Sequence, residues 1–128
     1  MVIFEAIIEG SPIVKKNNQK VAFRHGRPMK YNTPQYKRWE ATAINQLWGH
    51  DRPAEPIGQE CLLVCTFFMQ TRRTVDLSAL YEGIQDVLVK VGVLLDDNSR
   101  VVIGHDGSRV FHDPKRPRME IKILSATK

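Results

Sequence analysis

The most regular stretch of this chain is residues 61–97, which read CLLVCTFFMQTRRTVDLSALYEGIQDVLVKVGVLLDD. Its first nine residues are apolar and rich in β-type side chains, which predicts a central strand. From Leu77 to Val91, apolar residues recur at helical spacing, and Gly92 follows as a helix end. We therefore expect this strand and this helix to form the centre of the fold.

A second helix is predicted before this stretch. Thr33 and Pro34 form a typical helix start, an N-cap followed by proline at the first helical position. Apolar side chains then recur at helical spacing as far as Gly49, a plausible stop, and we expect them in the core. These side chains are Tyr36, Trp39, Ala43 and Leu47.

The remaining segments predict short strands and turns. Residues 2–9, 100–103 and 119–124 have β-type composition, and residues 104–108 have the composition of a turn. The basic segment 24–28 lies between two short apolar runs, which favours a hairpin. The sequence thus predicts one α+β domain over residues 1–128, with a mixed β-sheet and two main helices.

Composition restricts the class of protein. The 128 residues carry a net charge of +5, which favours a polyanion as partner. No apolar run approaches the roughly 18 residues that a membrane span needs, and the first residues lack the basic start and cleavage region of a signal peptide. We therefore expect a cytoplasmic protein with no membrane partner. Cys61 and Cys65, on one side of a strand and too far apart to bond, are expected to be buried free thiols.

Lysine and arginine side chains gather in three short segments, near residues 15–30, 72–73 and 115–118. Three such clusters in a short chain favour nucleic acid, because each cation at a phosphate releases counterions. The predicted DNA contacts are Lys15, Lys16, Arg24, Arg27, Lys30, Arg72 and Arg73. Phe23 and Tyr31 lie in the first cluster, and both a stacking role on bases and a core role remain open for them.

Against this basic background, Asp76, Glu82 and the pair Asp96-Asp97 form an acidic group within 22 residues. Carboxylates repel one another, so such a group indicates a cation or a basic partner. Simpler interpretations exist for each residue. Asp76 fits a helix N-cap, Glu82 fits a solvated helix face, and the Asp96-Asp97 pair fits a turn.

This acidic segment resembles the RusA family of Holliday-junction resolvases, which occur in phages and prophages. The family motif runs Asp-Leu-Asp-Asn, Lys, Asp-Ala-Leu, Gly and Asp-Asp. Asp76-Leu77 begins it here, Asp86-Val87-Leu88 fits its middle, and Asp96-Asp97 closes it. The segment 117–123 resembles the family's last strand. Motif similarity covers about half of the chain, and general layout covers the rest.

The resemblance implies a homodimer that cuts four-way DNA junctions with Mg²⁺ held by Asp76 and Asp97. Asp96 is a weaker candidate ligand, because neighbours on an extended chain point to opposite sides. Mn²⁺ is also compatible with an all-oxygen site. The chain departs from the motif at Ser78, where the family has its second aspartate, and at Glu82, where it has lysine. Because Ser78 and Glu82 are one helical turn apart, Glu82 is the predicted replacement for the missing carboxylate.

Two other functions compete with a nuclease. If the departures at Ser78 and Glu82 have removed the chemistry, the chain is a DNA-binding protein on the same fold. If the acidic residues instead bind a basic protein, it is a small interaction module. His105-Asp106 is a further candidate, either as a general base or as an ordinary exposed turn.

Overall fold

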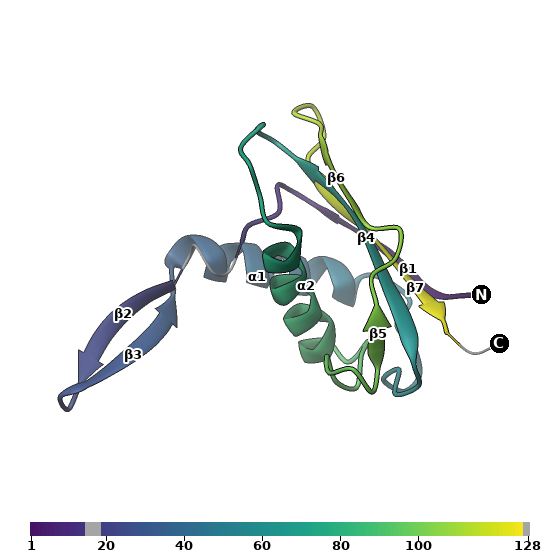
Figure 1. Ribbon diagram of the computed structural model, residues 1–128, viewed down its shortest axis with the longest axis horizontal. Helices are drawn as coiled ribbons and strands as arrows, with labels where there is room; N and C mark the ends of the chain where they lie inside the picture. The colour runs from purple at the N-terminus through teal and green to yellow at the C-terminus, as the bar shows by residue number, and fades with distance from the viewer. Residues whose placement is uncertain (15–18, 127–128) are drawn as a thin grey trace.

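The computed structural model describes residues 1–14 and 19–126, and a mixed five-stranded sheet forms its centre (Figure 1). The strands run in the order β1-β7-β4-β5, with β6 also paired to β4. Strand β4 pairs antiparallel with β7 and parallel with β5 and β6, so the predicted mixed sheet is confirmed. The strand bounds are β1 Val2–Glu9, β4 Cys61–Met69, β5 Val102–Gly104, β6 Arg109–His112 and β7 Arg118–Ser125.

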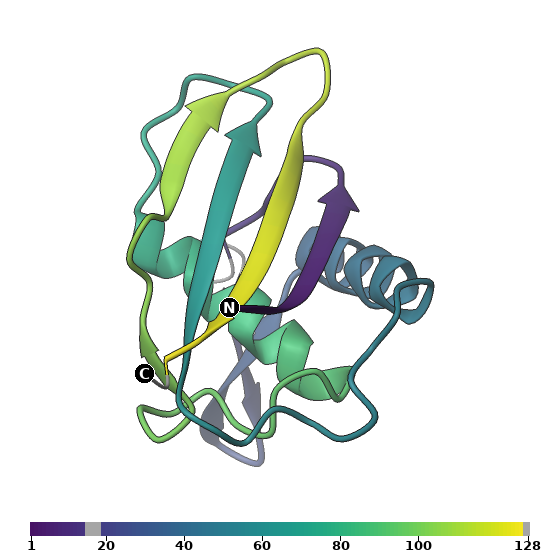
Figure 2. The ribbon, with the colours of Figure 1, turned by 90° about the vertical axis from the view of Figure 1, so that its right-hand side faces the viewer.

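One face of the sheet carries both helices, as Figure 2 shows. The alternation of β4 places every second side chain under the helices, and these side chains are fully buried. They are Cys61, Leu63, Cys65 and Phe67. Both cysteines are buried and free, as predicted. The strand that the sequence placed at the centre is therefore at the centre of the core.

Helix α1 spans Pro34–Trp48 and begins as predicted. The Thr33 Oγ1 accepts a hydrogen bond from the Tyr36 backbone nitrogen at 3.3 Å, and Pro34 occupies the first helical turn. All four apolar residues predicted to face the core from this helix are buried.

Helix α2 spans Leu77–Lys90 with Val91 as its C-cap, and Gly92 follows with a φ of +80° that suits glycine. It packs against α1 at Gly83. A β-carbon on Gly83 would lie 3.0 Å from the hydroxyl of Tyr36, so glycine permits this close approach. Neither α1 nor α2 nor any other helix in residues 1–14 and 19–126 is long and apolar enough to cross a membrane.

Strands β2, Gln19–Arg24, and β3, Arg27–Asn32, form a separate two-stranded sheet that projects from the rest of the molecule (Figure 1). The connecting residues His25 and Gly26 both have positive φ, 51° and 75°, as a tight two-residue hairpin requires. The predicted basic hairpin is therefore present. We call residues 19–32 the β2–β3 ribbon. Of the predicted DNA contacts, Lys15 and Lys16 fall outside the described residues.

Two details near the second half of the chain differ from the prediction. The short strand expected at residues 100–103 lies at Val102–Gly104, so it begins two residues later and ends one residue later. Strand β6, Arg109–His112, was not predicted at all. Its four residues are too few to show a period, and it forms because β4 offers an unpaired edge beside it.

Candidate functional site

Asp76 is the N-cap of α2, and its carboxylate is held by Ser78. The Asp76 Oδ1 accepts hydrogen bonds from the Ser78 backbone nitrogen at 3.1 Å and from the Ser78 Oγ at 2.8 Å. The N-cap interpretation of Asp76 is thus confirmed. Both side chains are exposed. The Ser78 hydroxyl therefore fixes the orientation of the Asp76 carboxylate.

Glu82 lies one helical turn after Ser78 on the exposed side of α2. It stands in an acidic neighbourhood. Burial raises the pKa of Tyr36, and the charges of Glu40, Asp86 and Glu82 raise it further, in that order. Asp86 forms an ion pair with Lys90 at 3.2 Å, and Lys90 also reaches Glu40 at 3.1 Å. Glu82 therefore extends an acidic surface shared by the two helices.

The pair Asp96-Asp97 lies in a tight, exposed loop after α2. Leu94 just before the pair is buried and forms a bridge to Ile57, which anchors the start of the loop. The backbone nitrogen of Asp97 donates to Asp96 Oδ1 at 2.7 Å, and that of Arg100 donates to Asn98 Oδ1 at 3.0 Å. These local bonds are those of a turn, the simpler interpretation of this segment.

The predicted metal ligands do not meet within one chain. Asp76 precedes α2 and Asp97 follows it in the chain, and the 14 residues of this helix (Figure 1) span about 21 Å along its axis. Over residues 1–14 and 19–126, the structure contains no group of three His, Cys, Asp or Glu side chains that could hold a metal ion. The oxygen donors suit Mg²⁺ in type, yet a single chain does not gather them. Their role as ligands stays a prediction.

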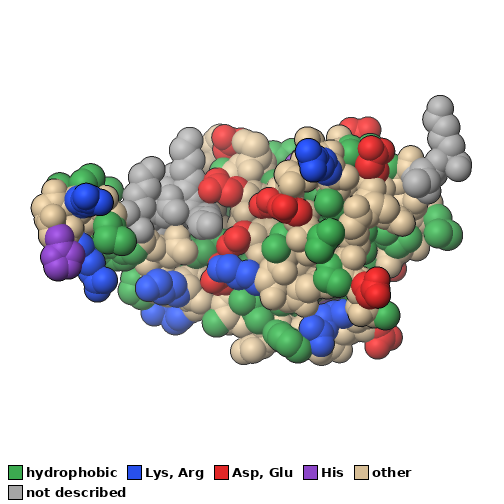
Figure 3. Space-filling view, turned by 90° about the horizontal axis from the view of Figure 1, so that it is seen from below, with side chains coloured by type: hydrophobic (Ala, Val, Ile, Leu, Met, Phe, Trp, Pro, Cys, Tyr) green, Lys and Arg blue, Asp and Glu red, His purple; other side chains and the backbone are tan. Residues whose placement is uncertain are grey.

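Exposed basic side chains occur in two segments, the connection between β4 and α2 and the β2–β3 ribbon. Arg72 and Arg73 are exposed in the segment that connects β4 to α2, directly before Asp76. Arg24 and Arg27 are exposed at the end of the β2–β3 ribbon. Figure 3 shows basic side chains on the ribbon and a row of acidic side chains on the body of the molecule. The side chain of Lys30 lies outside what the structure describes.

His105 is held against α2, a placement that the sequence did not predict. Its ring stacks on Tyr81, with 3.7 Å between centroids and 11° between planes, and its Nε2 donates to Gln85 Oε1 at 2.7 Å. Burial lowers the pKa of His105, opposed by the nearby charge of Asp106. Gln85 lies three residues after Glu82, so His105 contacts the same helix as the predicted ligand.

A buried hydrogen-bond network supports this histidine. The Tyr81 hydroxyl donates to the carbonyl of Leu63 at 3.1 Å and accepts from the Cys65 backbone nitrogen at 3.0 Å. Ser108 is hydrogen-bonded to Tyr81 and accepts from the same Cys65 nitrogen at 3.1 Å. Tyr81 therefore links β4 to α2 and gives the His105 ring a rigid surface. A tyrosine on the apolar side of a predicted helix was the signal available in the sequence.

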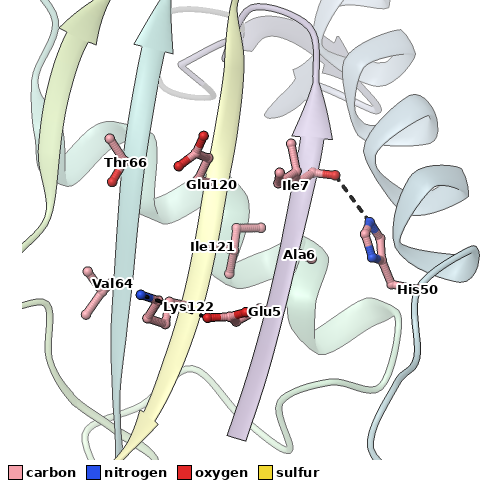
Figure 4. Close-up of a pocket in the computed structure, with 9 residues that line it drawn as sticks. All are labelled: Glu5, Ala6, Ile7, His50, Val64, Thr66, Glu120, Ile121 and Lys122. Atoms are coloured by element: carbon pink, nitrogen blue, oxygen red, sulfur yellow. Dashed lines mark hydrogen bonds and ion pairs between the residues drawn. The ribbon is translucent and has the colours of Figure 1, made fainter. Parts of the chain in front are cut away.

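The opposite face of the sheet holds a hollow that contains none of the predicted site residues (Figure 4). Lys122 lies 3.9 Å from Glu5 across β7 and β1, and His50 Nε2 donates to the carbonyl of Ile7 at 3.3 Å. The remaining lining residues are Ala6, Val64, Thr66, Glu120 and Ile121. The acidic group and the hollow are thus on different faces of the sheet.

No protein-family model matches this sequence, and the comparison with curated proteins found no significant match. The resemblance to the RusA family therefore rests on the motif residues quoted above.

Proposed function

We propose that this protein is a Mg²⁺-dependent, structure-selective DNA endonuclease that resolves four-way junctions as a homodimer. The observation that carries the proposal is the start of α2. There, the exposed cations Arg72 and Arg73 come four and three residues before the exposed carboxylate of Asp76, and the exposed carboxylate of Glu82 follows six residues after it. Cations that hold phosphates beside carboxylates that bind a divalent ion are the two parts that phosphodiester cleavage needs.

The separation of Asp76 from Asp97 supports the dimeric part of the proposal. One chain has one part of the ligand set at each end of α2. If two chains place their α2 helices antiparallel across a two-fold axis, Asp76 and Glu82 of each chain lie beside Asp97 of the partner subunit. Two equivalent sites result, which matches the two symmetric cuts that a four-way junction needs.

Each residue then has a definite role. Ser78 orients the Asp76 carboxylate, and Glu82 supplies the carboxylate that the serine lacks. Arg72 and Arg73 hold the phosphates on either side of the scissile bond. A bound Mg²⁺ supplies an oriented water and neutralises charge on the phosphodiester, and Mn²⁺ suits the same oxygen donors.

The first experiment is incubation of the protein with a labelled four-way junction and a matched duplex, in EDTA, Mg²⁺ or Mn²⁺. The proposal expects paired nicks on the junction only with a divalent ion. Glu82→Ala should abolish these nicks. A Glu82→Ala variant that cuts at the wild-type rate would remove Glu82 from the site.

A second experiment tests where the site is assembled. Asp76→Asn and Asp97→Asn should each be inactive alone. If each site takes Asp76 from one chain and Asp97 from the other, a mixed dimer of the two variants contains one intact site and one doubly altered site. The mixture should therefore regain single nicks without paired cuts. A mixture as inactive as either variant, despite proven subunit exchange, contradicts the shared site.

A second candidate function is junction binding without cleavage. It is favoured by Ser78, which replaces an acid and is hydrogen-bonded to Asp76, and by the lack of a three-ligand group in the described part of one chain. Tight binding with no nicks in either metal would establish this alternative.

A further inference from the structure

The β2–β3 ribbon exposes apolar side chains that the core does not use. The exposed fractions are 75% for Phe23, 57% for Val21, 50% for Met29 and 42% for Tyr31. In the described residues, β2 and β3 pair only with each other. An isolated two-stranded ribbon is marginal in water, and apolar residues exposed together mark a contact with a partner. These exposed residues therefore belong to an interaction surface.

The register divides the end of the ribbon into two different faces. Phe23 is paired with Pro28, and Val21 lies two residues before Phe23 on the same face. Arg24 is paired with Arg27 next to the turn, on the other face, which also carries Met29. The tip of the ribbon thus combines an exposed aromatic ring with two guanidinium groups.

The charge of the ribbon indicates the kind of partner. Residues 19–32 contain four Lys or Arg and no Asp or Glu. Pairing with the ribbon of a second copy would place like charges opposite one another, which is unfavourable. Nucleic acid combines phosphates with flat base surfaces. A two-stranded ribbon also fits a DNA groove, and an aromatic side chain stacks on any base.

We propose that the β2–β3 ribbon recognises unpaired or unstacked bases, with Phe23 stacked on a base while Arg24 and Arg27 hold the neighbouring phosphates. This inference takes its substrate, branched DNA, from the proposed function, but it requires no cleavage. The ribbon then gives preference for a branch point over ordinary duplex, because only a branch point offers an open base.

The test measures binding in EDTA, where no cutting occurs. The probes are a four-way junction with 2-aminopurine at the branch point and a duplex of the same arm sequence. Phe23→Ala should weaken junction binding by about tenfold or more and abolish the change in 2-aminopurine fluorescence. Its affinity for the duplex should stay within about twofold of wild type.

Four matched variants complete the design. Phe23→Trp should keep the junction preference, because indole also stacks. Phe111→Ala removes an aromatic ring that is also exposed, at 50%, but lies outside the ribbon, on β6, and should change little. Arg24→Ala and Arg27→Ala should weaken junction and duplex alike and lower the salt dependence of binding by about one ion each.

Two results would overturn the inference. If Phe23→Ala weakens binding to the junction and to the duplex equally, or changes neither affinity, the Phe23 ring does not recognise open bases. Phe23→Ala that dissociates a dimer in sedimentation velocity while DNA binding is unchanged shows that the ribbon contacts a second copy. The two proposals can also fail separately. If the wild-type protein makes no metal-dependent nicks but Phe23→Ala still weakens junction binding as expected, the nuclease proposal is wrong and the proposed role of the ribbon stands.

Discussion

Helix α2 buries its apolar side chains, whereas the β2–β3 ribbon exposes them to solvent. In α2, Leu80, Ile84, Val87 and Leu88 are at most 2% exposed, whereas Val21 and Phe23 of the ribbon are more than half exposed. Both segments have a clear apolar pattern in the sequence. This difference shows that an apolar pattern predicts a helix or a strand. It does not predict whether another part of the same chain covers the apolar side chains.

The largest expected effect is on stability, and it contrasts the two regions directly. Ile84→Ala removes a fully buried side chain and should lower the free energy of unfolding by about 3 kcal/mol. Val21→Ala on the ribbon should change it by less than about 0.5 kcal/mol. Urea denaturation of both variants measures this. Equal losses would mean that the ribbon is part of the folding core.

The contact between α1 and α2 gives a second prediction. Gly83→Ala should be destabilising, because its new methyl group meets the buried Tyr36 hydroxyl. No described residue hydrogen-bonds that hydroxyl, so Tyr36→Phe alone should cost little. In the double variant, Tyr36→Phe should offset about 1 kcal/mol of the Gly83→Ala loss. Strict additivity in the double-mutant cycle would contradict the close packing.

A third prediction separates the two roles of Asp76. Asp76→Ala should lower the free energy of unfolding by about 1 kcal/mol, since the N-cap is lost, whereas Asp76→Ser keeps a capping oxygen and should be nearly neutral. Both variants should lose nicking if Asp76 is a ligand. Thermal unfolding and the junction assay read the two roles independently. If Asp76→Ser still nicks the junction, Asp76 is not a ligand and acts only as the N-cap of α2.

The smallest effect concerns His105. Burial holds its folded pKa below its ordinary value of 6.5, so the unfolded chain takes up the proton first as pH falls. Stability from this group is therefore complete above about pH 6.5 and declines as pH drops toward the folded pKa. The difference in unfolding free energy between pH 7.5 and pH 5.5 should shrink in His105→Asn. If the difference is unchanged in this variant, the His105 ring is protonated in the folded protein without a loss of stability.

Much of the fold followed from local patterns in the sequence. The strand β4, the Thr33 cap and the buried face of α1 were predicted because each depends on residues a few positions apart. The position of Asp76 before α2 and of Asp97 after it was not weighed in the prediction of a shared site, since closeness in sequence hides the length of the helix between them. The stacking of His105 on Tyr81 was not predicted either, because it depends on how the segment after β5 packs against α2 in the folded chain.

The ribbon is joined to α1 by one residue. β3 ends at Asn32 and α1 begins at Pro34, so Thr33 alone separates them, and Tyr36 three residues later packs on Gly83 beside Glu82. In mechanical terms the ribbon is a lever, and the first turn of α1 is its pivot. A force on the ribbon would therefore reach α1 next to its contact with α2, close to Glu82.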